Sequence, residues 1–85
     1  MGKYERVLRR VLSGRSDANV RFRDLRGLLL VLGFEERVRG GHHIFAREDV
    51  GELINLQREG SDARPYQVRQ VREVIRRHGL RGENG

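Results

Sequence analysis

Two adjacent histidines in the segment RVRGGHHIF, residues 37–45, are the side chains of this 85-residue chain best suited to proton transfer near neutral pH. An unperturbed imidazole has a pKa of about 6.5, so it can take or give a proton in that range. The chain has one other histidine, His78, and no cysteine. Thiolate nucleophiles, thiolate metal sites and disulfides are therefore excluded.

The adjacency of His42 and His43 limits what they could do together. Both are expected in a strand, where neighbouring side chains point to opposite faces of a sheet. The two side chains are then not expected to bind the same phosphate, unless His42 still belongs to the turn. A zinc centre needs three or four converging ligands, so no metal site and no cofactor are predicted. For a hairpin histidine taken alone, a half-buried structural residue is the commoner explanation.

The charge favours a polyanionic partner without proving one. The formal net charge is +6, and 17 of the 18 basic residues are arginine. Residues 1–34 have a net charge of +5, residues 35–62 of −3 and residues 63–85 of +4. The planar arginine fork suits phosphates, which points to nucleic acid. A nucleotide bias towards arginine codons would give the same composition.

No membrane segment is expected, because no apolar run approaches the roughly 20 residues that span a bilayer. The segment MGKYERVLRRVLSG is too charged for a signal peptide. With no cysteine, these features favour a cytoplasmic protein.

Apolar side chains repeat at helical spacing in three segments. They predict helices over residues 3–13, over about 22–32, and from Pro65 to Gly79. Gly14, Gly33 and Gly79 are suitable C-terminal caps, and proline fits the first turn of a helix.

The middle of the chain predicts a sheet. Residues 34–40 and 42–48 are two candidate strands joined at Gly40-Gly41, a pair typical of a tight hairpin. Residues 51–57 supply a third strand, and residues 58–64 are predicted as a loop. The expected fold is a single α+β domain over residues 1–85, in the order α-α-β-β-β-α. Its three-stranded antiparallel sheet would have helices on one face and the other face open.

Four blocks of the sequence, in this order, resemble the HicA-type (YcfA-like) toxins, which are mRNA interferases of type II toxin–antitoxin modules. They are Gly33-Phe34, GGHHIF at residues 40–45, Leu56-Gln57 and PYQVRQVR at residues 65–72. The resemblance covers roughly residues 13–80. It defines residues 14–80 as the HicA-like core and residues 3–13 as an N-terminal helical extension. The segment RGENG, residues 81–85, is predicted to be a frayed tail.

The resemblance implies a fold similar to a double-stranded-RNA-binding domain and ribosome-independent cleavage of mRNA. It also implies neutralisation by a HicB-type antitoxin, with a monomer when alone and a larger complex with the antitoxin. The family's catalytic histidine, at the start of the second strand, corresponds to His42. The family usually has serine where this chain has Gly41, so activity would be weak or lost if that hydroxyl contacts substrate.

We therefore predict that His42 is the general acid or base of a metal-independent endoribonuclease, since no carboxylate cluster suggests catalytic magnesium. Alternation places the side chains of Arg37 and Arg39 on one face of their strand, which favours joint contact with a phosphate. Each could also be a solvated surface arginine with no such role. The residues predicted to bind RNA are Gly40, Gly41, His43, Arg37, Arg39 and Arg47.

Two other classes of function remain open. One is a catalytically inactive RNA-binding module of double-stranded-RNA type, and the other is an interaction protein that binds a partner through the open sheet face. The arginines of the last helix fit RNA or partner contacts as well as a solvated face; they are Arg69, Arg72, Arg76 and Arg77. Gln57, Tyr66 and Gln67 are interpreted as structural links between the third strand and the last helix.

Overall fold

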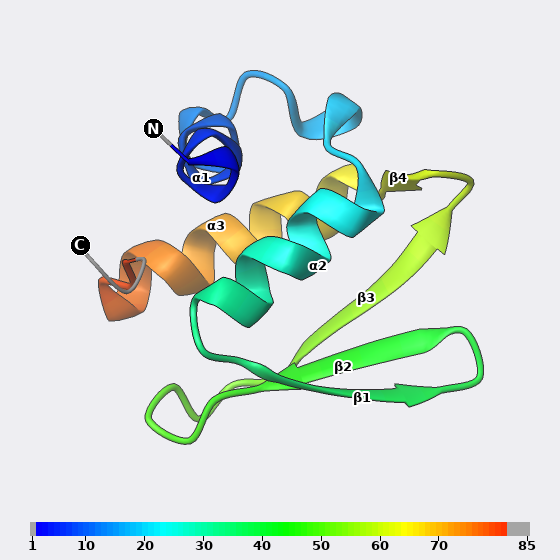
Figure 1. Ribbon diagram of the computed structural model, residues 1–85, viewed down its shortest axis with the longest axis vertical. Helices are drawn as coiled ribbons and strands as arrows, with labels where there is room; N and C mark the ends of the chain where they lie inside the picture. Colours follow the sequence, from blue (N-terminus) through cyan, green and yellow to red (C-terminus); the bar gives the residue numbers. More distant parts are fainter. Residues whose placement is uncertain (1, 82–85) are drawn as a thin grey trace.

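The computed structural model describes residues 2–81, which form three helices and one antiparallel sheet (Figure 1). The predicted frayed tail, residues 81–85, lies outside the described residues except for Arg81. The α+β class is confirmed. The elements, in order, are α1 (Lys3–Ser13), a 3-10 turn η1 (Asp17–Asn19), α2 (Phe22–Val31), β1 (Glu35–Arg39), β2 (His42–Ala46), β3 (Ile54–Glu59), β4 (Asp62–Ala63) and α3 (Pro65–His78).

The sheet has four strands in the order β1-β2-β3-β4, each antiparallel to its neighbour, so the prediction of three strands is wrong. Residues 58–64 form a hairpin rather than a loop. Gly60 has a φ of 64° at its turn, and Asp62 also bridges to Arg21 before α2. The third strand begins at Ile54 rather than Gly51, because Gly51 adopts a φ of 73° that turns the chain.

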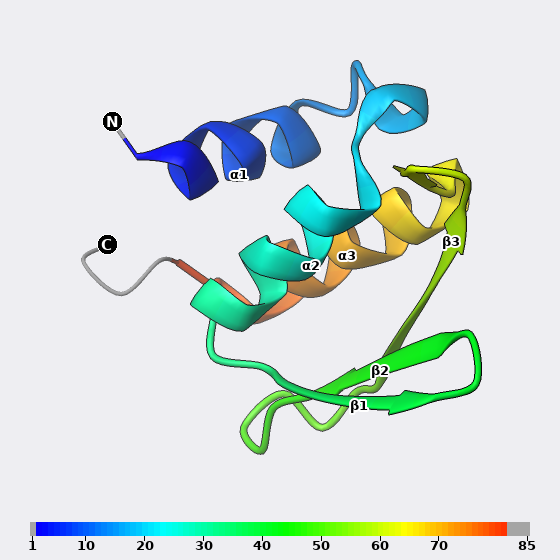
Figure 2. The ribbon, with the colours of Figure 1, turned by 45° about the vertical axis from the view of Figure 1, so that its right-hand side comes forward.

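The molecule has three layers (Figures 1 and 2). Helices α2 and α3 cover one face of the sheet, as expected, whereas α1 packs on the two helices from the side away from the sheet. Phe45, Ile54 and Leu56 of the sheet are fully buried against Leu25 and Val68 of the two helices. No helix formed by residues 2–81 covers the opposite face of the sheet (Figures 1 and 2).

Glycine caps set how the chain leaves the helices. Gly33, with a φ of 95°, ends α2, and the N–H of Phe34 then donates to the carbonyl of Leu29 at 3.0 Å. Gly79, with a φ of 60°, ends α3, and the N–H of Leu80 donates to the Ile75 carbonyl at 3.0 Å. Both glycine caps are as predicted, and the first of them directs the chain into β1.

Arginines of α3 hold α1 in place. Arg72 donates to the carboxylate of Asp17 at 2.9 Å and to the carbonyl of Val11 at 3.1 Å. Arg76 donates to the Leu12 carbonyl at 2.8 Å. The sequence fits either RNA contact or a solvated position for these two arginines, and the structure shows that they connect α3 to the C-terminal end of α1. None of the described helices is long and apolar enough to cross a membrane.

Candidate functional site

The β1–β2 turn consists of Gly40 and Gly41 alone, because Arg39 and His42 are paired across the two strands. Gly40 has a φ of 58°, while Gly41 lies outside the left-handed region, an arrangement typical of a type II′ turn. A Cβ on Gly41 would meet only the Gln57 side chain, at an ordinary 3.9 Å. The backbone would therefore accept the serine that the HicA family usually has here.

His42 and His43 point to opposite faces of the sheet, as strand alternation predicts. His42 is exposed on the open face. His43 faces the helices and is half-buried, with its ring 4.8 Å from that of Phe22 in an edge-on arrangement. Because their side chains lie on different faces, the two histidines cannot hold one phosphate together.

Asn55 of β3 orients the His42 ring. Its Oδ1 lies 3.3 Å from His42 Nδ1, and both side chains are exposed on the open face. With Oδ1 as the acceptor, Nδ1 carries the ring proton and Nε2 keeps a free lone pair. His42 is then arranged to accept a proton at Nε2.

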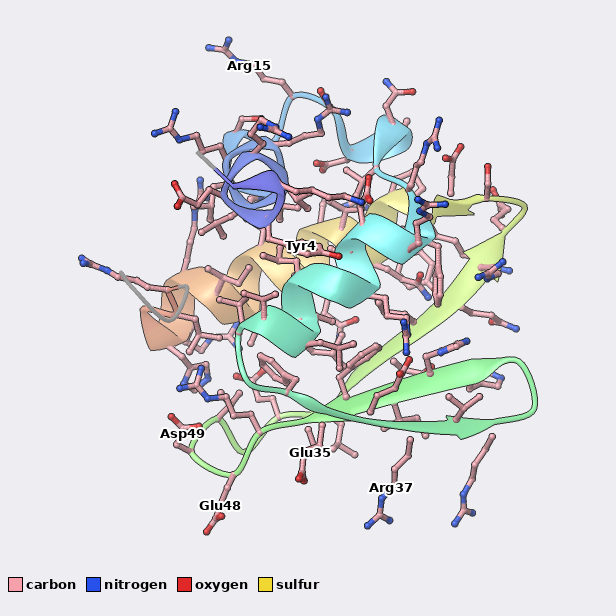
Figure 3. The ribbon with its side chains drawn as sticks, viewed as in Figure 1. Tyr4, Arg15, Glu35, Arg37, Glu48 and Asp49 are labelled. Atoms are coloured by element: carbon pink, nitrogen blue, oxygen red, sulfur yellow. The ribbon has the colours of Figure 1, made fainter. Side chains whose placement is uncertain are left out.

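Two arginines of β1 share this face with His42. Arg39 is its direct cross-strand neighbour, and Arg37 lies two residues back on the same side. Figure 3 shows Arg37 pointing away from the helices. Beside them is a hollow of about 350 Å³, which the two arginines and one carboxylate, that of Glu35, line around an aliphatic floor that includes Ile44 and Leu53. Such a surface can hold phosphate oxygens with its cations and place an aromatic base against its apolar floor.

His43 belongs to a different group of charges. Its Nδ1 lies 2.7 Å from the carboxylate of Glu36, which also accepts two short hydrogen bonds from Arg26 of α2. The Arg26 hydrogen bonds, assisted by that of His43 and opposed by burial, lower the pKa of Glu36 below its ordinary value. This group joins α2 to the hairpin on the helix side. His43 is thus not brought to the open face with the other predicted RNA-binding residues.

Arg47 is not brought to His42 either. It follows β2, five residues beyond His42, which is about 16 Å in an extended strand. Its side chain donates to the Leu32 carbonyl at 2.9 Å and pairs with Asp49 at 2.8 Å. The neighbouring hollow of about 670 Å³ is larger than the one on the open face. It is bordered by the carboxylates of Glu35, Glu48 and Asp49 (Figure 3), which would repel a polyanion.

His78 lies far along the chain from the pair, at the end of α3. Its Nε2 is 2.7 Å from the Glu52 carboxylate, which also binds Arg77. The hydrogen bonds from His78 and then Arg77 lower the pKa of Glu52. Among residues 2–81, no group of three or more metal-binding side chains lies together.

The sequence-based prediction of this site missed Asn55, although its exposed position between buried Ile54 and Leu56 follows from alternation. The structural interpretation of Gln67 is confirmed. Gln67 is 2% exposed, and its amide, suitably oriented, bonds both the N–H and the C=O of Gln57 at 3.0 and 3.1 Å.

Comparison with known proteins adds no relative. No family model matches the chain, and no curated protein or solved structure matches it significantly.

Proposed function

We propose that the chain is an endoribonuclease of the HicA type, the toxin of a type II toxin–antitoxin module, and that His42 is its proton-transfer residue. One observation supports this most directly. The His42 ring is exposed on the open sheet face beside the turn, with Asn55 at Nδ1 and Arg39 across the strand pair. The antiparallel sheet with α2 and α3 on one face supports the likeness to a double-stranded-RNA-binding domain.

The proposed reaction is an internal transesterification of RNA. His42 Nε2 takes the proton of a 2′-hydroxyl, whose oxygen attacks the adjacent phosphorus. The new O2′–P bond forms as the P–O5′ bond breaks, and the departing 5′ oxygen receives a proton from the imidazolium or from water. Arg37 and Arg39 neutralise charge on the non-bridging phosphate oxygens. The proposed reaction uses no metal ion or cofactor.

The proposal assigns the chain an mRNA substrate, a HicB-type antitoxin as its protein partner and a cytoplasmic location. On its own the toxin is a monomer, and it forms a larger complex when the antitoxin binds. The substrate and the protein partner rest on the sequence resemblance, whereas the location rests on the composition of the chain.

The test compares His42→Ala with His78→Ala, a matched loss of one imidazole far from the hairpin. Purified proteins are incubated with mixed mRNA, with and without a chelator. His42→Ala should keep the wild-type circular dichroism spectrum and lose at least about a hundredfold in cleavage rate. His78→Ala should cleave as wild type does. Equal cleavage by wild type and His42→Ala would remove His42 from the chemistry.

One observation favours a second candidate, a non-cleaving RNA-binding module. Gly41 supplies no hydroxyl where the family usually has serine. This module would bind duplex RNA in a salt-dependent way and show no cleavage at any protein concentration. The Gly41→Ser variant distinguishes the two, since a gain of cleavage would show that only this hydroxyl is missing.

A further inference from the structure

Basic side chains from two separate segments line one groove on the side of the molecule away from the sheet. The groove lies between α1 and the connection from η1 into α2, and its volume is about 290 Å³. Lys3, Arg6 and Arg10 line it from α1, and Arg21 and Asp24 line it from the other wall. Four cations and one carboxylate thus border a single groove.

Buried contacts fix both walls of this groove. The three basic residues of α1 recur at helical spacing on one face, while Val11, on the other side of α1, is fully buried. Arg72 of α3 joins the two walls, because it donates to the Val11 carbonyl of α1 and pairs with Asp17 of η1, and both side chains of that ion pair are largely buried. The cations are therefore presented by a supported surface and not by a free tail.

The charge on the groove is only partly balanced within the chain. Asp24 pairs with Lys3 at 3.3 Å. Arg10 makes a long contact of 3.4 Å with the Asn19 carbonyl. Arg21 is exposed and has no side-chain hydrogen bond or ion pair with another residue of the described part. Like charges on facing walls repel each other unless an anion lies between them, so the groove is suited to a bound polyanion.

The sheet relates this groove to the His42 site. His42 pairs with Gln57 of β3, whereas Asp62 of β4 pairs with Glu59 and bridges to Arg21. These pairings place His42 and Arg21 three strand spacings apart across the sheet and two residues apart along the strands. Their backbones are therefore about 16 Å apart. His42 faces the open side of the sheet and the groove lies on the helix side, so the RNA must also pass around the edge of the sheet, and a few nucleotides of extended RNA can cover this path.

We propose that the groove between α1 and the η1–α2 connection binds the phosphate backbone of single-stranded RNA that extends from the His42 site. The choice of RNA rests on the proposed function, while the choice of phosphates rests on the arginines. A single strand fits better than a duplex because a strand lying between the walls meets cations on both sides. The N-terminal helix, which lies outside the HicA-like core, thus adds a substrate-binding surface.

The test measures binding of a short single-stranded 2′-O-methyl RNA, which cannot be cleaved through its 2′ oxygen, by fluorescence anisotropy at several salt concentrations. Arg21→Glu is compared with Arg15→Glu, an equal charge reversal at a side chain that projects into solvent (Figure 3). Arg21→Glu should weaken binding about tenfold at low salt and reduce the salt slope by about 0.7 for each lost phosphate contact. Arg15→Glu should change affinity by less than about twofold.

Equal affinities of the two variants for the RNA would overturn the inference. So would an equal Arg21→Glu loss for polyglutamate, because the groove would then be suited to an acidic protein. The cleavage assay with His42→Ala separates this inference from the proposed function. If wild type does not cleave RNA but Arg21→Glu weakens binding, the groove stands and the enzymatic proposal fails. If cleavage depends on His42 but Arg21→Glu binds RNA normally, the enzymatic proposal stands and the inference about the groove fails.

Discussion

At the scale of single residues, the two histidines differ in what their Nδ1 atoms bind. His42 Nδ1 faces a neutral amide, so the ring is oriented while the residue stays exposed to solvent. His43 Nδ1 faces the carboxylate of Glu36, which is also bound by Arg26. An oriented and exposed ring suits proton transfer to a polymer, whereas a ring held in a half-buried ion-pair group suits structural support.

The first prediction concerns Glu36 and the pH dependence of stability. Because its folded-state pKa is lowered from 4.5, its contribution is complete well above pH 4.5 and is lost as pH falls through the lower folded value. Glu36→Gln should reduce the free energy of unfolding at pH 7 by about 2 kcal/mol, the scale of hydrogen bonds to a charged group. The difference from wild type should shrink towards pH 3. Urea unfolding of both proteins at pH 7, 5 and 3 measures this difference in the free energy of unfolding.

The control for this prediction is Glu35→Gln. Glu35 is the neighbouring carboxylate, but it points away from the helices on the open face and is exposed (Figure 3). Its replacement should change stability by less than about 0.5 kcal/mol at every pH. A pH-independent loss in Glu36→Gln would show that the amide packs badly and that the carboxylate charge is not the cause.

At the scale of elements, the contact of α1 with α2 depends on a glycine. A Cβ on Gly27 would overlap the phenol ring of Tyr4, which lies between the two helices (Figure 3). Alanine in a helix interior is favoured over glycine by about 1 kcal/mol, but overpacking costs about 1–3 kcal/mol. Gly27→Ala should therefore destabilise the wild type by about 1 kcal/mol, as measured by urea unfolding.

The same substitution should have the opposite sign once the ring is removed. In a Tyr4→Ala background, Gly27→Ala should stabilise the protein by about 1 kcal/mol. Equal effects in both backgrounds would mean that Tyr4 does not pack over Gly27, and that α1 does not dock on α2 in this way.

Helices were easier to predict than strands in this chain, for local reasons. The bounds of α1 follow from its apolar spacing and from Gly14, with no need for distant contacts. Strand β4 has only two residues, Asp62 and Ala63, and depends on pairing with β3 and with Arg21. Local periodicity contains no signal for such a short strand, so its segment was predicted as a loop.

The site was predicted only in part, because some of its contacts depend on packing and strand pairing and not on local sequence. Alternation separates His42 from His43, but which one faces the helices is decided by packing, since His43 lies on the same side as fully buried Phe45. Arg47 was grouped with the hairpin because it is near in sequence, yet an extended strand carries it away from His42. Asn55 is distant in sequence and reaches His42 only through the pairing of β2 with β3.

At the scale of the whole molecule, the basic residues lie on different surfaces, so substitutions on one surface at a time test which of them binds the proposed RNA substrate. Arg39 is exposed on the open sheet face across from His42, whereas Arg69 is exposed on α3. Replacing either by glutamine changes the net charge equally, and at 0.15 M salt exposed charges are screened beyond about 8 Å. The two variants therefore differ mainly in the local contact that is lost.

Arg39→Gln should lower kcat/KM for RNA cleavage about tenfold or more, because a charge-assisted hydrogen bond to phosphate is worth about 1.5–3 kcal/mol. Arg69→Gln should lower it by less than about twofold. The measurement is the initial rate of cleavage of a labelled RNA at 0.15 M salt, with circular dichroism to confirm folding. Equal losses in both variants would mean that the net charge, and not the open sheet face, attracts the substrate, and His42 would then lie on the wrong surface for the proposed reaction.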